Sequence, residues 1–111
     1  MDASVDEAVV IVGERVGRGA PVGAEQVVMI RYQTRVDGGE VVDLSGVRPL
    51  RFRRGAGAVI EGLERGLEGM RVGGRRTLRV PAALAYGRAG LGDRVPPLAA
   101  LVVEVEVLAA E

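Results

Sequence analysis

The chain has 111 residues, of which 48% are hydrophobic and 27% are charged, and its 15 basic and 15 acidic side chains cancel to a net charge of zero. This length fits one domain, and the composition is that of a globular protein rather than a disordered one. A net charge of zero gives no general attraction to polyanions, so we expect neither a nucleic acid nor a membrane as partner.

The residue types that are missing exclude several kinds of chemistry. The chain has no Cys and no His, which removes disulfides, thiolate nucleophiles, imidazole acid–base catalysis and the usual zinc ligands. We therefore expect neither a metal nor a cofactor. Residues 1–4 lack the basic and apolar segments of a secretion signal, and no apolar run is long enough to span a bilayer. A cytoplasmic location is the resulting expectation, and we also expect a monomer.

Hydrophobic patterning predicts strands in chain order from the N-terminal end. Residues 8–12 form a continuous apolar run, which is typical of a short buried strand. Residues 26–36 alternate, which indicates a half-buried antiparallel strand with one apolar face. That face carries Val28, Ile30, Tyr32 and Thr34. The same pattern predicts further strands over residues 40–43, 50–53, 75–80 and 99–109.

One segment, residues 59–70, has the periodicity of an amphipathic helix. Its apolar positions are Ile60, Leu63, Leu67 and Met70. Three glycines in the same segment each weaken a helix by roughly 1 kcal/mol relative to Ala, so we expect the helix to be stabilised by close packing on the sheet. The acidic residues Glu61, Glu64 and Glu68 are interpreted as a solvated face rather than a metal or acid–base site.

Residues 81–98 form a long segment without sustained periodicity between two predicted strands. Loops of this length in compact domains are often functional, which makes this segment the first place to expect a site. Tyr86 lies in it, while the other two aromatic residues, Tyr32 and Phe52, lie on predicted strands. Asp43 follows two valines near a strand end and needs a polar partner, for which a Tyr hydroxyl or an Arg would serve.

The order of short motifs resembles the FKBP-type peptidyl-prolyl isomerases. The resemblance extends from about Val9 to Glu111, and its most specific elements are Val-Ile-x-Gly, Ala-Tyr-Gly and Pro-Pro-x-Ala-x-Leu in that order. These elements stand at Val59–Gly62, Ala85–Gly87 and Pro96–Leu101. The family implies an α+β fold, in which an antiparallel sheet of about five strands wraps over one short amphipathic helix. Residues 1–111 would form a single such domain, with residues 1–7 as a flexible N-terminus.

The resemblance also implies a pocket between the helix and the concave face of the sheet. Catalytic roles would fall to Tyr32, Asp43, Ile60 and Tyr86, with the Ile60 N–H and the Tyr86 hydroxyl holding substrate carbonyls and Asp43 hydrogen-bonded to Tyr32. The substrate-binding residues would be Val42, Leu50, Phe52, Val59, Leu63, Val95 and Val103, with Val95 on a loop that overhangs the pocket.

Four of these positions depart from the family pattern. Val42, Leu50, Leu63 and Val103 stand where the family usually has Phe, Phe, Trp and Phe. Replacing a buried ring by an aliphatic side chain removes contact area worth on the order of 1 kcal/mol of ligand binding at each position. Binding of rapamycin-like macrolides is therefore expected to be weak.

The predicted activity is isomerisation of X-Pro peptide bonds in proline-containing peptides or proteins, with a role in protein folding. Rotation requires no proton transfer, because an apolar pocket lowers the barrier by disfavouring the charge-separated resonance form of the amide. This suits a chain without His or Cys. Two alternatives stay open: a non-catalytic module that grips a peptide or partner in the same groove, and an accessory protein that binds an apolar ring in small-molecule biosynthesis.

Overall fold

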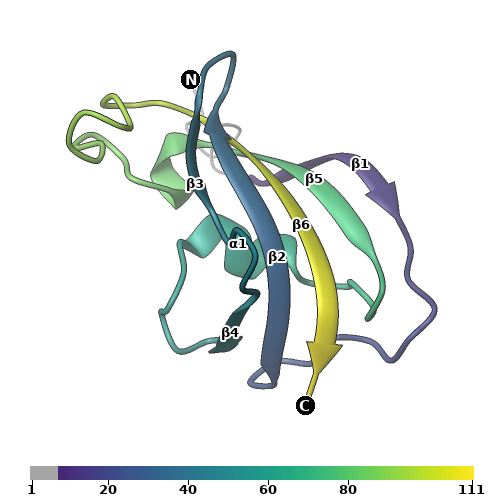
Figure 1. Cartoon of the computed structure of the whole chain (residues 1–111). Helices are drawn as coiled ribbons and strands as arrows, with labels where there is room; N and C mark the ends of the chain where they lie inside the picture. The colour runs from purple at the N-terminus through teal and green to yellow at the C-terminus, as the bar shows by residue number, and fades with distance from the viewer. Residues whose placement is uncertain (1–7) are drawn as a thin grey trace.

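A computed structural model describes residues 8–111 of the chain, so the expected flexible segment 1–7 lies outside the described residues. The strands form one antiparallel sheet in the spatial order β1-β5-β6-β2-β3, and β4 also pairs with β2. Figure 1 shows helix α1 lying on one side of this curved sheet. The elements in chain order are β1 (Val10–Arg15), β2 (Val27–Val36), β3 (Val41–Leu44), β4 (Leu50–Arg53), α1 (Glu61–Gly66), β5 (Arg75–Val80), the 3-10 turn η2 (Ala82–Leu84) and β6 (Leu101–Ala110).

The sheet has six strands in five lateral positions, which explains why the resemblance implied about five. β4 pairs with β2 from Val27 to Ile30, whereas β3 pairs with β2 from Gln33 to Arg35. The two short strands therefore lie end to end along the same edge of β2. The expected antiparallel sheet over one short helix is the observed fold.

The core lies between α1 and the sheet, where the alternation of the long strands turns their apolar side chains inward. Val103 and Val107 of β6 are fully buried, as are Val28 and Ile30 of β2. Leu78 of β5 is buried in the same cluster. The face of β2 predicted from the sequence is therefore the core face.

Strand β1 differs from the expectation of a short buried strand. It runs from Val10 to Arg15 rather than over residues 8–12, and all six of its residues are exposed. Val10, Ile11 and Val12 are 50%, 46% and 58% exposed. The reason is topological, because β1 lies at the edge of the sheet, beside β5.

Helix α1 is also shorter than the predicted 59–70 segment and ends at Gly66. The chain then continues in tight turns, with the Leu67 and Met70 amides donating to the carbonyls of Leu63 and Leu67 at 3.1 and 3.0 Å. Both side chains are still buried. The predicted apolar positions thus reach the core, although the final turn is not helical because Gly69 takes a left-handed φ of +79°.

The glycines of α1 allow the close approach to the sheet that the sequence predicted. A methyl group on Gly62 would lie 2.2 Å from Cγ1 of Val80, and one on Gly66 would lie 2.2 Å from Cδ1 of Leu78. Both distances are far below van der Waals contact. The backbone of α1 therefore rests directly on the side chains of β5.

Two buried arginines hold the C-terminal end of α1. The Arg76 guanidinium donates to the carbonyls of Gly66, at 2.9 Å, and of Glu68, and forms an ion pair with Glu14 at 2.7 Å. The Arg54 guanidinium donates to the Glu64 carbonyl at 3.2 Å. Cations at this position satisfy carbonyls that a helix leaves unpaired and oppose its dipole.

The acidic side chains on α1 are only partly the solvated face that was expected. The Glu64 side chain is 17% exposed, lies 3.7 Å from Nε of Arg54, and accepts the Gly55 N–H at 2.7 Å. Glu61 and Glu68 do face solvent. Glu64 was misassigned because helical periodicity does not reveal that the loop before the helix folds back onto this side chain.

Gly66→Ala should lower the free energy of unfolding by about 1–2 kcal/mol, because overpacking against Leu78 costs more than the roughly 1 kcal/mol that Ala adds to helix stability. Urea unfolding followed by circular dichroism measures this change. Gly13→Ala is the matched control, since its methyl group would lie 3.7 Å from Oγ1 of Thr77, an ordinary contact. A Gly66→Ala variant at least as stable as the parent would contradict the packing.

Candidate functional site

The apolar residues predicted for the pocket belong to one hydrophobic cluster beneath and beside α1. They differ in how much surface they expose. Four are buried, namely Phe52, Leu63, Val95 and Val103. Six are partly exposed and pack against the buried set, namely Tyr32, Val42, Leu50, Val59, Ile60 and Tyr86.

The floor of the predicted pocket offers little surface to a ligand. Phe52, Leu63 and Val103 are 6%, 4% and 0% exposed, so they underlie the site rather than enclose a bound ring. Leu63 and Val103 carry short aliphatic side chains that end within the core. The accessible surface instead belongs to the half-buried side chains, among them Val42, Ile60 and Tyr86.

Val95 lies on the long loop, as expected, but its side chain does not overhang the site. It is 1% exposed. Its N–H donates to the Leu91 carbonyl at 3.1 Å and its carbonyl accepts the Leu91 N–H at 2.8 Å. This tight turn directs Val95 into the core, where it anchors the loop to the rest of the domain.

Tyr32 and Asp43 form the polar wall of the site. The Tyr32 hydroxyl donates to Oδ2 of Asp43 at 3.0 Å, which is the hydrogen bond expected from the sequence. The partner strands place the two residues close together, because Asp43 pairs with Thr34 of β2 and so lies on the same side of the sheet as Tyr32.

Ser45 supports this wall, and it was absent from the sequence-based prediction. Its hydroxyl accepts the Tyr32 N–H at 3.1 Å, and its own N–H donates to the Tyr32 carbonyl at 3.0 Å. These bonds tie the end of β3 to β2 beside Asp43. Ser often bonds to backbone groups, and its place two residues after the predicted strand 40–43 was the available signal.

The ionisation of Tyr32 reports on this environment. Burial is the largest cause that raises its pKa, to about 12, followed by the hydrogen bond to Asp43 and the negative charge of that carboxylate. Proximity to Tyr86 adds to the effect. Tyr32 therefore remains a neutral hydrogen-bond donor at physiological pH.

Two hydrogen-bond donors at the site have no partner among residues 8–111. The Ile60 carbonyl accepts the N–H groups of Leu63 and Glu64 and so starts α1, while the Ile60 N–H donates to no group in the described part of the chain. The Tyr86 hydroxyl likewise makes no hydrogen bond there, although the Tyr86 carbonyl accepts the Gly90 N–H at 3.0 Å. Both donors are available to a ligand carbonyl.

An open groove of 740 Å³ adjoins the polar wall. It runs between the β2–β3 hairpin and the loop of residues 81–98, and it shares Val42 and Asp43 with the predicted site. Arg94 donates from Nη1 to the Val42 carbonyl at 3.2 Å and so connects the loop to β3. This contact was not predicted from the sequence, because it joins residues 52 positions apart.

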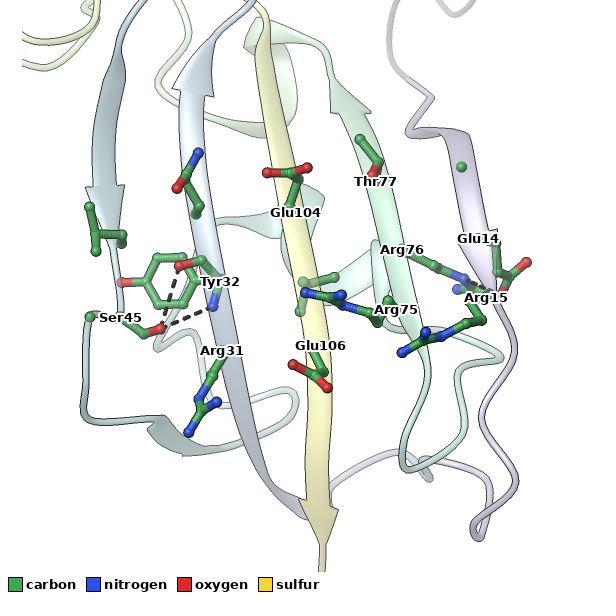
Figure 2. Close-up of a pocket in the computed structure, with 15 residues that line it drawn as sticks. Glu14, Arg15, Arg31, Tyr32, Ser45, Arg75, Arg76, Thr77, Glu104 and Glu106 are labelled. Atoms are coloured by element: carbon green, nitrogen blue, oxygen red, sulfur yellow. Dashed lines mark hydrogen bonds and ion pairs between the residues drawn. The ribbon is translucent and has the colours of Figure 1, made fainter.

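A second hollow, of 570 Å³, lies on the opposite face of the sheet. Figure 2 shows its charged lining, with Glu104 and Glu106 on β6 between Arg31 on β2 and Arg75 on β5. These side chains alternate along the strands with the buried ones, so this hollow is separated from α1 by the sheet. Of the predicted site residues only Tyr32 borders it.

Among the described residues, no group of three or more His, Cys, Asp or Glu side chains is arranged to hold a metal ion. In the same part of the chain, no helix has the length and hydrophobicity needed to cross a membrane.

Comparison with known proteins identifies close relatives. The family model of the FKBP-type peptidyl-prolyl cis-trans isomerases matches residues 19–108. FK506-binding protein 4 of Dictyostelium discoideum is 39% identical over 84% of the chain, which spans 26% of that protein. The FK506-binding protein of Neisseria meningitidis is 38% identical over 86% of the chain and 87% of its own length. The chain thus spans about a quarter of some relatives and most of others.

Two solved structures are similar to this chain in both fold and sequence. The crystal structure of AtFKBP13 superposes with a TM-score of 0.80 and 32% identity, covering 93% of this chain and 91% of that one. A peptidyl-prolyl cis-trans isomerase from Pseudomonas syringae pv. tomato superposes with a TM-score of 0.79 and 31% identity, covering 93% and 74% of the two chains.

Titration of Tyr32 tests the polar wall. In a Tyr86→Phe variant Tyr32 is the only tyrosine left to ionise, since the chain has two tyrosines. Tyrosinate absorbance should rise with a midpoint well above pH 10, slightly lowered from about 12 by the loss of the Tyr86 contribution. Adding Asp43→Asn should lower that midpoint only partly, because burial is the larger cause. Because the pKa is higher in the folded state, this contribution to stability is complete below pH 10 and is lost towards pH 12. A midpoint of 10 in the Tyr86→Phe variant would contradict the arrangement.

Proposed function

Since the chain belongs to the FKBP-type peptidyl-prolyl cis-trans isomerase family, we propose that it catalyses cis–trans isomerisation of X-Pro bonds in peptides and proteins and thereby assists protein folding. The family match covers the elements that build the site, from β2 to β6. The site residues proposed to act on the substrate are Tyr32, Asp43, Ile60 and Tyr86, with the partly exposed apolar side chains around them.

The observation that carries the proposal is the pair of unpaired donors beside an apolar surface. The Ile60 N–H and the Tyr86 hydroxyl lack partners among residues 8–111, and both residues pack against the hydrophobic cluster. Donors with this exposure and these neighbours can hold the carbonyl groups of a peptide while its proline ring rests on the apolar surface.

The proposed catalysis forms no covalent bond between the protein and its substrate. Rotation about an X-Pro bond takes roughly tens to hundreds of seconds without a catalyst, because resonance stabilises the planar amide. The planar ground state has more charge separation than the twisted transition state. Transfer of the amide from water to the surface formed by Val42 and Ile60 therefore favours the twisted form.

The two donors would further favour the twisted form of the amide by holding the substrate peptide around the rotating bond. A thousandfold acceleration needs about 4 kcal/mol of differential stabilisation, and one or two hydrogen bonds formed in a partly dry site can supply a large part of it. Asp43 and Tyr32 would position the wall against which the substrate lies.

A second candidate function is a non-catalytic module that binds proline-containing segments in the same place. The observation that favours it is the closed floor, because Leu63 and Val103 are 4% and 0% exposed. A shallow site can hold a peptide without enclosing the proline ring. The two candidates differ in whether the bound X-Pro bond rotates faster.

Tyr86→Phe should reduce kcat/KM for a short X-Pro peptide about two- to twelvefold, which corresponds to the loss of one hydrogen bond of about 0.5–1.5 kcal/mol. NMR exchange spectroscopy or a protease-coupled assay measures the rate. Thr77→Val is the matched control, because it removes a hydroxyl from the opposite face of the sheet and should leave kcat/KM unchanged. If the parent protein binds X-Pro peptides but accelerates none, the binding module is the correct function.

Weak macrolide binding is proposed for the same physical reason. The aliphatic floor removes ring contacts, so rapamycin should bind weakly, and Leu63→Trp should strengthen its binding about fivefold by restoring roughly 1 kcal/mol of contact. Isothermal titration calorimetry measures both affinities, with the melting temperature checked for each protein. A nanomolar Kd for the parent protein would show that the missing rings do not limit binding.

A further inference from the structure

The groove between the β2–β3 hairpin and the 81–98 loop is a continuation of the proposed proline site. It has a volume of 740 Å³ and is lined by both Val42 and Asp43, which also belong to that site. A peptide whose proline rests near Ile60 and Tyr86 extends beyond the proline in both directions, so one flanking segment can enter this groove. The inference that follows rests on the proposed function.

Backbone hydrogen bonds fix both walls of the groove. On the hairpin side, Val36 donates to the Glu40 carbonyl at 3.0 Å and Gly39 donates to the Val36 carbonyl at 2.7 Å. On the loop side, the Arg94 N–H donates to the Leu91 carbonyl at 3.0 Å. The Arg94 side chain then spans from the loop to the Val42 carbonyl. This contact thus connects the loop wall to the hairpin wall.

The walls of the groove carry a net negative charge. Glu40, Asp43 and Asp93 contribute three carboxylates, whereas Arg94 contributes one guanidinium. Among residues 8–111, neither Glu40 nor Asp93 has an ion-pair partner within 4.0 Å. Asp43 accepts the Tyr32 hydroxyl, and Arg94 is bound to a backbone carbonyl. The two remaining carboxylates are therefore available to a substrate.

The same groove also has apolar lining residues. They are Val36, Val41, Val42, Leu44 and Pro96. A side chain suited to this combination has a long hydrocarbon stem that covers apolar surface and a cationic end that reaches the carboxylates, as Lys and Arg have.

We propose that the groove selects X-Pro substrates that carry Lys or Arg near the proline, with Glu40 and Asp93 as the specificity-determining residues. Both carboxylates are exposed, and exposed ion pairs contribute little each. The expected preference for a basic over an acidic peptide is therefore roughly two- to fivefold in kcat/KM. It should act through KM, because both residues lie outside the set that contacts the rotating bond.

The test uses two series of short X-Pro peptides, one with the variable residue before the X-Pro bond and one with it after. Each series has Lys, Gln and Glu versions at the same position. In at least one series the parent protein should act on the Lys peptide with a kcat/KM about two- to fivefold above that of the Glu peptide. Raising ionic strength from about 0.1 M to about 1 M should reduce this ratio towards one, since the Debye length falls from roughly 10 Å to 3 Å.

The Glu40→Gln, Asp93→Asn double variant should bring the Lys-to-Glu ratio close to one and leave kcat/KM for the Gln peptides unchanged. Glu104→Gln, Glu106→Gln is the matched control, because it removes two carboxylates from the opposite face of the sheet and changes net charge equally. This control should keep the preference.

The outcomes separate this inference from the function on which it rests. Equal rates for Lys, Gln and Glu peptides in both series would overturn the selectivity and leave the isomerase function intact. A preference that persists in the groove double variant, or is lost in the outer-face control, would also overturn it. Absence of acceleration for every peptide, including Gln, would instead contradict the isomerase function, and fluorescence anisotropy of the same labelled peptides would then test the charge preference in binding.

Discussion

The contact between α1 and β5 is the constraint on which the rest of this domain depends. A helix of only six residues packs on one side of the sheet, so each of its turns must lie close to the strands. Gly62 and Gly66 permit that approach by removing side chains where Val80 and Leu78 project. The position of α1 in turn fixes Ile60 at its start, and with it the unpaired N–H of the proposed site.

Two buried arginines also help to hold α1 in this position. Arg54 and Arg76 are 7% and 8% exposed, and both donate to carbonyls near the end of α1. Their charges are balanced by Glu64 and Glu14. Because a planar guanidinium can donate in several directions at once, each residue joins the helix to a neighbouring strand or loop. The short helix is thus held by charge-assisted hydrogen bonds as well as by apolar packing.

Much of the fold could be predicted from the sequence, because alternation and helical spacing are patterns of residues that lie close together in the chain. The alternation in β2 and β6 and the spacing of Leu63, Leu67 and Met70 identified the core faces correctly. The burial of β1 was predicted wrongly, because an apolar run does not reveal whether a strand is central or outermost. The Tyr32–Asp43 hydrogen bond was predicted, whereas the support from Ser45 and the link from Arg94 to β3 depend on how distant segments meet, which the pattern of one chain does not specify.

The position of β6 has a consequence for synthesis of the protein. β6 follows every other strand in sequence, yet it lies between β5 and β2 and pairs with both. Until it leaves the ribosome, β1 and β5 have no connection through the sheet to β2, β3 and β4. Before that point the sheet of the nascent domain consists of two separate parts, and their apolar faces are exposed. A protein proposed to assist the folding of others is therefore itself exposed to misfolding until its last strand is available.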